Sequence, residues 1–124
     1  MPGPEAFLPR RVPITAYGKG GFGFEDMRHE GSLLILADGV HRWRPETLDE
    51  LEIGDFAALF AEAAPGSFLL LGTGPAIARP ARAIREAFSA RGIGLDFMDT
   101  GAAVRTWNVL VAENRAACAA FLRP

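Results

Sequence analysis

A short run of large apolar residues that ends at two glycines constrains the fold of this chain more than any other feature. Phe68 to Leu71 are all large and apolar, and Gly72-Thr73-Gly74 follows them. Such a run is typical of a strand buried on both faces. The glycines let the backbone turn sharply and approach another group closely. We therefore expect this strand inside a sheet, with a site at its carboxyl end.

The residues that follow predict a helix, a strand and a second helix. Pro80 suits the first position of a helix that Gly92 ends. A strand over Ile93–Met98 leads to Asp99-Thr100-Gly101, where Asp99 or Thr100 can cap a helix that continues to about residue 112. Parallel strands joined by a helix cross over right-handedly, so both glycine turns should meet at the edge where open α/β sheets bind ligands.

The first half of the chain predicts hairpins and one helix. Ile14–Tyr17 and the glycine-rich stretch after it indicate two short strands joined by a turn. Residues 31–43 contain Asp38-Gly39 and predict a second hairpin. Asp55 is expected to cap a helix that ends near Pro65. The proline-rich residues 1–13 should form a flexible arm ahead of one domain, 14–124.

Composition excludes several classes of function. The 124 residues carry a net charge of −2 with a pI near 5.7, which argues against a nucleic-acid partner. No apolar run is long enough to span a bilayer as a helix. A single cysteine, Cys118, and two histidines, His29 and His41, give no metal-ligand cluster. We expect no metal and no cofactor, a reducing compartment such as the cytoplasm, and Cys118 as a small packed residue.

Two catalytic or cofactor interpretations fit the sequence poorly. His41 beside Trp43 could act as a general base, but no motif places a nucleophile or carboxylate near it, so a structural role at a sheet edge is favoured. Gly72-Thr73-Gly74 could begin a dinucleotide fingerprint with Asp96 or Asp99 as the ribose acid. Ile77 stands where the third glycine belongs, which disfavours this interpretation.

Several segments together resemble a known family. The strand 69–74, the run Gly92-Ile93-Gly94, the segment Met98–Leu110 and the stretch Glu113-Asn114-Arg115 are similar to the family known as domain of unknown function 498, or the Mth938-like domain. The similarity extends from Ile14 over nearly the whole chain, and Met98–Leu110 is its most specific part. Val104 stands where the family often has cysteine, and Trp107 where tyrosine is common.

The resemblance implies a fold and a class of function. The fold is a three-layer α/β domain with a central mixed sheet whose last strand runs antiparallel to the others, plus the amino-terminal hairpin. Alanine propensity favours a helix at the end of the chain, but the resemblance implies that Arg115–Leu122 is that strand. Mitochondrial members act as assembly factors for respiratory complex I, the NADH:ubiquinone oxidoreductase, and are not known as enzymes.

We therefore expect a non-catalytic protein-binding domain, cytoplasmic or peripheral at the inner membrane. The alternative is a small-molecule-binding protein or enzyme that uses the same sheet edge. Asn108 needs hydrogen-bond partners, either loop carbonyls near Gly74 or a ligand, and Arg105 could bind an anion or be solvated. The candidate ligand or partner site comprises Trp43, Gly72, Thr73, Gly74, Asp99, Thr100, Gly101, Arg105 and Asn108.

Overall fold

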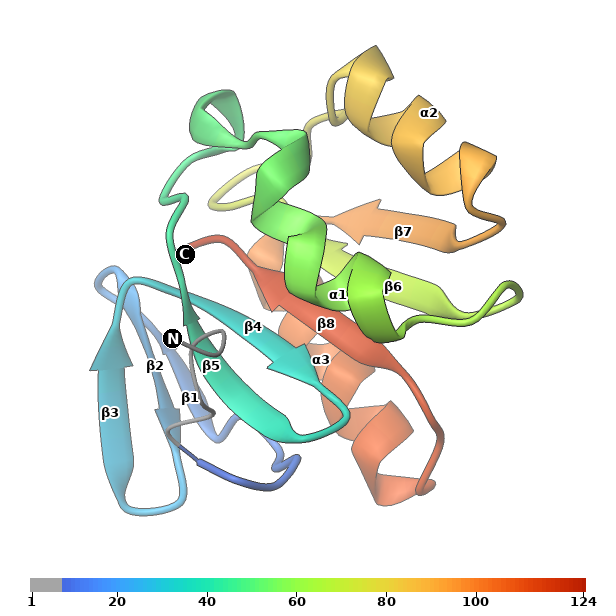
Figure 1. The fold of residues 1–124 in the computed structure, drawn as a ribbon. Coiled ribbons are helices and arrows are strands. Elements are labelled where there is room, and N and C mark those ends of the chain that lie inside the picture. The colour runs from blue at the N-terminus through green and yellow to red at the C-terminus, as the bar shows by residue number, and fades with distance from the viewer. Residues whose placement is uncertain (1–7) are drawn as a thin grey trace, which may run out of the picture.

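A five-stranded sheet forms the centre of the molecule (Figure 1). The computed structural model describes residues 8–124. The strands lie in the order β5-β4-β8-β6-β7. Their bounds are Ser32–Leu36 for β4, Gly39–Trp43 for β5, Phe68–Gly72 for β6, Gly94–Met98 for β7 and Cys118–Phe121 for β8. The predicted buried strand at residues 68–71 is confirmed, because β6 lies between β8 and β7 and three of its leucines are fully covered.

The sheet is mixed, as expected, but the antiparallel strand is β4 and not the last strand. β4 pairs antiparallel with both β5 and β8, whereas β8 is parallel to β6 and β6 to β7. The expected direction of the last strand was therefore wrong with respect to β6. The physical reason is that a strand which follows a crossover helix returns to the sheet in the parallel sense. The carboxyl ends of β5, β8, β6 and β7 consequently lie at one edge.

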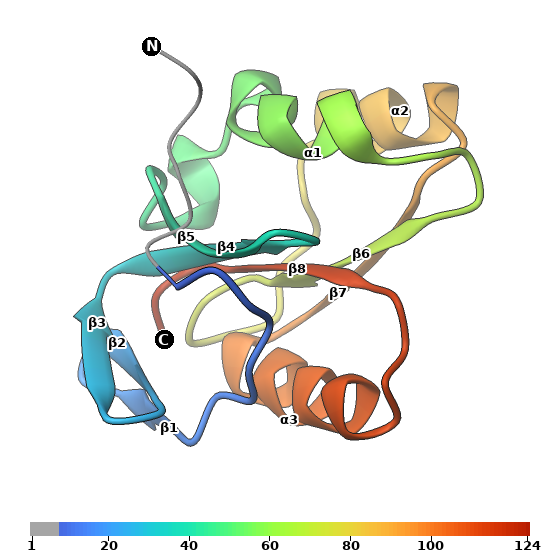
Figure 2. The ribbon, with the colours of Figure 1, turned by 60° about the horizontal axis from the view of Figure 1, so that its bottom comes forward.

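Helices cover both faces of the sheet and produce the predicted three layers (Figure 2). On one face lie α1, Ala57–Glu62, and α2, Arg82–Ala90, while α3, Thr100–Ala112, covers the other. Strand alternation sends neighbouring residues into different cores. Leu70 packs in the core under α3, and Leu69 and Leu71 pack in the core under α1 and α2.

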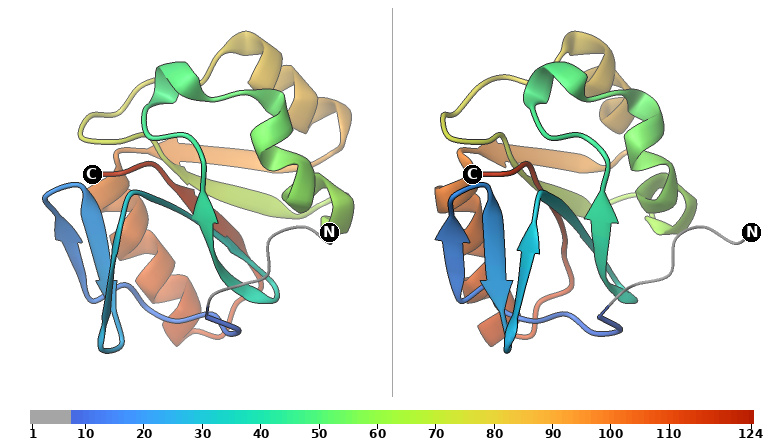
Figure 3. Two further views of the ribbon diagram at one scale, coloured as in Figure 1. Left: turned by 60° about the vertical axis from the view of Figure 1, so that its left-hand side comes forward. Right: turned by 90° about the vertical axis from the view of Figure 1, so that its left-hand side faces the viewer.

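A small antiparallel sheet lies on the same side as α3 (Figure 3). It comprises β1, Ala16–Gly18, β2, Gly21–Phe24, and β3, Met27–Glu30. The predicted amino-terminal hairpin is confirmed as β1 and β2, and β3 extends it. Phe22 of β2 is fully buried and its ring centroid lies 5.9 Å from that of Phe121. This contact joins the small sheet to the core.

The chain ahead of β1 packs on the domain in the part that the structure describes. Leu8 and Val12 are 7% and 4% exposed and belong to the core under α3. The Val40 N–H donates to the Leu8 carbonyl at 2.9 Å, which covers the outer edge of β5. The expectation of a flexible arm is therefore wrong for residues 8–13, because its apolar side chains are needed to close the core. Residues 1–7 of the expected arm lie outside the described residues.

Two helix starts differ from the sequence-based expectation. Leu48–Glu50 forms a short 3₁₀ turn, η1, and a second one, η2 over Ile53–Phe56, leads into α1. Glu52 caps η2, and Asp55 returns a hydrogen bond to the Glu52 N–H at 2.8 Å, so Asp55 closes a capping box instead of being the N-cap. Helix α2 begins at Arg82, two residues after Pro80. Between residues 8 and 124 no helix is long and apolar enough to cross a membrane.

Candidate functional site

The two glycine turns meet at the carboxyl edge of the sheet, as the crossover rule predicted. We call Gly72-Thr73-Gly74 together with Asp99-Thr100-Gly101 the turn site. The Thr73 N–H donates to the Met98 carbonyl at 2.8 Å, and the Thr100 N–H donates to the Gly74 carbonyl at 2.9 Å. The ends of β6 and β7 are therefore held together by their own backbones.

Thr100 is the centre of the turn site. Its side chain is fully buried, and its hydroxyl donates to the Leu122 carbonyl at 2.7 Å while it accepts from the Gly74 N–H at 2.8 Å. A Cβ on Gly72 would lie 2.8 Å from the Thr100 Oγ1, so only glycine fits there. Asp99 caps α3, as predicted, by accepting from the Ala102 N–H at 2.8 Å.

Thr73 shapes the loop that leaves the turn site. Its hydroxyl donates to the Ala76 carbonyl at 2.7 Å and accepts from the Ala78 N–H at 3.2 Å. Helix α2 begins only at Arg82, after this loop. A dinucleotide site needs a helix N-terminus directly after the glycines to hold the pyrophosphate. The loop therefore argues against that use of the glycines.

A hollow of about 380 Å³ opens beside the turn site. We call it the acidic hollow. Glu46 and Glu50 lie on one wall, and the Arg123 Nη1 is 2.7 Å from the Glu46 Oε1. The Glu50 carboxylate accepts from the Glu46 N–H at 3.1 Å. The residues that line the acidic hollow are Glu46, Thr47, Leu48, Glu50, Thr73, Gly74, Pro75, Arg123 and Pro124.

Sequence reasoning missed the outer walls of this hollow. None of the candidate site residues lies in the segment that contains Glu46 and Glu50, and the last strand was expected to run antiparallel. Because β8 is parallel to β6, the residues after β8, including Arg123, reach the same edge of the sheet as Gly74. The available signal was the rule that parallel strands end at one edge.

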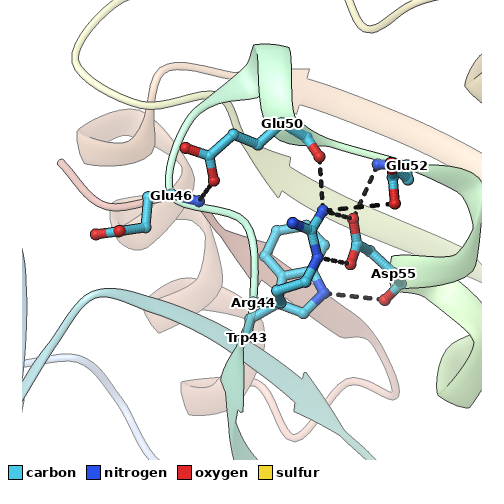
Figure 4. Close-up of polar contacts among 6 residues, drawn as sticks. All are labelled: Trp43, Arg44, Glu46, Glu50, Glu52 and Asp55. Carbon is cyan, nitrogen blue, oxygen red and sulfur yellow. Dashed lines mark hydrogen bonds and ion pairs between the residues drawn. The ribbon is translucent and has the colours of Figure 1, made fainter.

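An ion pair braces the loop that forms the acidic wall (Figure 4). The Arg44 guanidinium contacts both carboxylate oxygens of Asp55 at 2.7 Å, and its Nη2 donates to the Glu50 carbonyl at 2.6 Å. The Asp55 side chain is 7% exposed, and the hydrogen bond from Arg44 lowers the pKa of its carboxyl below the ordinary value. The candidate residue Trp43 is buried and its indole N–H donates to the Asp55 carbonyl at 3.0 Å. Trp43 therefore helps to hold this loop in position through the hydrogen bond to Asp55.

Arg105 and Asn108 lie farther along α3, and of the two only Arg105 comes near the turn site, since it bonds Tyr17, whose hydroxyl would be 3.0 Å from a Cβ on Gly101. The Arg105 guanidinium donates to the Tyr17 hydroxyl at 2.7 Å. The Asn108 Oδ1 accepts from the Ile14 N–H, and its Nδ2 donates to the Ile14 carbonyl, each at 2.8 Å. The predicted partners of Asn108 near Gly74 were therefore wrong. Asn108 instead faces the chain ahead of β1, and no local sequence pattern places that segment against α3.

The surroundings of His41 and Cys118, two further residues with reactive side chains, indicate structural roles. His41 lies on the edge strand β5, is buried, and its Nε2 is 2.7 Å from the Asp38 Oδ1 in the turn. Burial, together with the nearby Glu62 carboxylate, raises the pKa of the Cys118 thiol to about 11. The thiol is thus protonated and weakly nucleophilic near neutral pH. Residues 8–124 contain no cluster of three or more His, Cys, Asp or Glu side chains suited to a metal ion.

Comparison with known sequences gives relatives over most of the chain. Residues 14–122 match the family described as "Protein of unknown function (DUF498/DUF598)". An uncharacterised Rhodobacter capsulatus protein is 35% identical over 90% of this chain and 84% of its own length. NADH dehydrogenase (ubiquinone) 1 alpha subcomplex assembly factor 3 is 26% identical in Danio rerio and 27% in Rattus norvegicus, over 90% and 94% of this chain. The chain spans 64% and 63% of those two proteins.

Solved structures share the fold. A Bartonella henselae structure described as an outer membrane protein is 38% identical, with a TM-score of 0.83 over 94% of this chain and 98% of its own. A Rhodopseudomonas palustris protein is 37% identical, with a TM-score of 0.81 over 94% and 87%. A Bordetella pertussis protein described as a Mth938-like domain is 27% identical, with a TM-score of 0.73 over 90% and 85%. The chain therefore belongs to the DUF498/DUF598 family and has the fold of the Mth938-like domain.

Proposed function

We propose that this chain is a non-catalytic protein-binding domain that acts in the assembly of respiratory complex I. The relatives named as assembly factors support this role, since their similarity covers nine-tenths or more of the chain. We place the protein in the cytoplasm or at the inner face of the membrane that holds the complex. In this proposal the binding surface is the turn site with the acidic hollow beside it.

The observation that carries the proposal is the internal hydrogen bonding of the turn site. The Thr100 hydroxyl is occupied by Gly74 and Leu122, and the Thr73 hydroxyl by its own loop. Groups that already bond to each other are poorly placed to bind a phosphate or to move a proton. They do hold the loops around the hollow in fixed positions, which favours binding because little conformational freedom is lost when a partner docks.

The acidic hollow indicates what the partner contributes. Glu46 and Glu50 are exposed on one wall, while Leu48 and Pro75 add apolar surface. A lysine or arginine of the partner can place its charge by the carboxylates and its methylene stem on the apolar wall. The Glu46–Arg123 pair is half exposed on both sides, so an incoming cation can compete for it.

A small-molecule ligand is the second candidate, and the size of the hollow favours it. About 380 Å³ lies within the range of small-molecule pockets. The convergence of Glu46, Glu50 and Arg123 would suit a polar ligand that carries both a donor and an acceptor. This alternative predicts a thermal shift of the isolated protein by a cell metabolite extract from which all protein has been removed.

Native co-purification with one variant of the hollow tests the protein-binding proposal. Thr47→Arg places a basic side chain on the exposed wall of the hollow, and Ser89→Arg makes the same charge change on the exposed surface of α2. We expect complex I subunits or assembly proteins to co-purify with the wild type and Ser89→Arg, and to be lost with Thr47→Arg. Recovery of no complex I protein by the wild type would contradict the proposal, as would equal recovery by both variants.

A further inference from the structure

The two edge strands of the central sheet differ in whether another segment pairs with their outer side. The outer side of β5 carries the backbone of Leu8, whose carbonyl accepts from the Val40 N–H. At the other end of the sheet, β7 pairs with β6 alone, and no strand among residues 8–124 lies on its outer side (Figure 1). An unpaired edge presents a row of free backbone donors and acceptors to another chain.

The register identifies which groups of β7 face outward. The Gly94 N–H and the Met98 carbonyl each make a 2.8 Å hydrogen bond at the two ends of the β6 pairing. In a parallel pair the residues alternate between facing the neighbouring strand and facing away from it. Leu95 and Phe97 therefore direct their N–H and carbonyl groups to the outer edge. Both side chains are only partly buried, against the core under α1 and α2.

The charge of this edge selects the occupant. Asp96 is exposed and forms none of the ion pairs within the described part of the chain. Residues 92–103 carry two acids, Asp96 and Asp99, and no lysine or arginine. A second copy of β7, paired antiparallel about its centre, would set Asp96 opposite itself, and like charges in that position destabilise a sheet.

We propose that β7 accepts an extended, basic segment of a partner protein as a sixth strand. Backbone hydrogen bonds to Leu95 and Phe97 supply the pairing. The segment alternates apolar residues, which extend the surface of Leu95 and Phe97, with a lysine or arginine on the α3 side opposite Asp96. The inference rests on the proposed protein-binding role but uses a surface separate from the acidic hollow.

Amide hydrogen exchange with a defined peptide tests this proposal. The probe is a short peptide of alternating valine and lysine with blocked ends, and the matched peptide has glutamate in place of lysine. We expect the lysine peptide to slow exchange at Leu95 and Phe97, and the glutamate peptide to leave both unchanged. Equal slowing by the two peptides, or no slowing by either, would overturn the proposal.

Two charge-reversal variants distinguish binding of the peptide at β7 from general electrostatic attraction to the protein. Asp96→Lys should weaken binding of the lysine peptide about tenfold, because an attractive cross-strand pair becomes a repulsive one. Asp26→Lys makes the same change in the exposed β2–β3 turn and should leave the affinity unchanged. The affinity of Asp96→Asn for the lysine peptide should lie between those of the two charge-reversal variants. A variant that loses the circular dichroism signal of the fold is excluded from the comparison.

Other occupants would appear as different results in the same experiment. Slow exchange at Leu95 and Phe97 without peptide, which grows with protein concentration, would show that a second copy takes the edge and would overturn the proposal. The hollow variant Thr47→Arg should bind the lysine peptide as the wild type does. Failure of the peptide assay therefore leaves the co-purification result intact, and failure of co-purification leaves the edge result intact.

Discussion

The Thr100 hydroxyl accepts a hydrogen bond from the Gly74 N–H at 2.8 Å and thereby ties the start of α3 to the end of β6. The same hydroxyl donates to the Leu122 carbonyl at 2.7 Å, beyond the end of β8. One buried side chain thus joins the ends of three parallel strands at the edge that carries the turn site. The position of the acidic hollow depends on this junction, because Gly74 and Arg123 both line the hollow.

Replacement of Thr100 by valine should cost about 2 to 4 kcal/mol of unfolding free energy, since it leaves two buried backbone groups without a partner. Valine keeps the shape of the side chain, so the loss reports the hydroxyl. Urea denaturation measures the change. Thr106→Val, on the exposed face of α3, should change stability by less than about 0.5 kcal/mol. Equal stability of Thr100→Val and the wild type would contradict the claim that the Thr100 hydroxyl holds the three strand ends together.

Gly72→Ala should destabilise the protein by about 1 to 3 kcal/mol, because its methyl group would lie 2.8 Å from the Thr100 Oγ1 and 3.0 Å from the Thr100 Cα. Gly54→Ala is the matched control, since a Cβ there has nothing within 4 Å. It should be neutral or stabilising by up to about 1 kcal/mol. Thermal unfolding of the two variants side by side checks the contrast, and a loss of the same size in both would exclude a local clash.

Asn108→Ala should weaken the attachment of the chain ahead of β1. It removes both hydrogen bonds to the Ile14 backbone, and we expect a loss of about 1 to 3 kcal/mol. Faster proteolytic cleavage before residue 14 should accompany the loss. Val109→Ala, at the next and largely exposed position, should leave the cleavage rate unchanged. Unaltered cleavage in Asn108→Ala would show that the two hydrogen bonds do not hold this segment.

The Arg44–Asp55 pair should make stability depend on acid pH. Because the pair lowers the folded-state pKa of Asp55, its contribution is present above the unfolded pKa of about 4 and is lost as the pH falls through the folded value. Asp55→Asn should therefore flatten the loss of stability below about pH 4. Urea titrations across that range measure it. Asp26→Asn removes an exposed carboxylate elsewhere and should keep the wild-type slope.

The local parts of the fold were predictable from the sequence. The apolar run before Gly72 identified β6, and Asp99 identified the start of α3, because both signals depend on neighbouring residues alone. The meeting of the two glycine turns followed from the handedness of the crossover. These elements place the turn site, and the structure has them where they were expected.

The parts that were wrong depend on contacts distant in sequence. The packing of Leu8 and Val12 is decided by a core that forms only after α3 has covered the sheet. Asn108 could have bonded any nearby backbone, and its actual partner is 94 residues away. The direction of β8 decides whether Arg123 reaches the hollow, and the crossover through α3 favours the parallel direction, whereas the resemblance had implied an antiparallel strand.

The level of assembled complex I in cells that lack this protein tests the central proposal most directly. We predict that native gels show reduced complex I in the deletion strain, with wild-type levels restored by the intact gene or by Ser89→Arg. Thr47→Arg should fold normally and fail to restore the complex, because its side chain occupies the acidic hollow. Normal complex I in the deletion strain would contradict the proposed function.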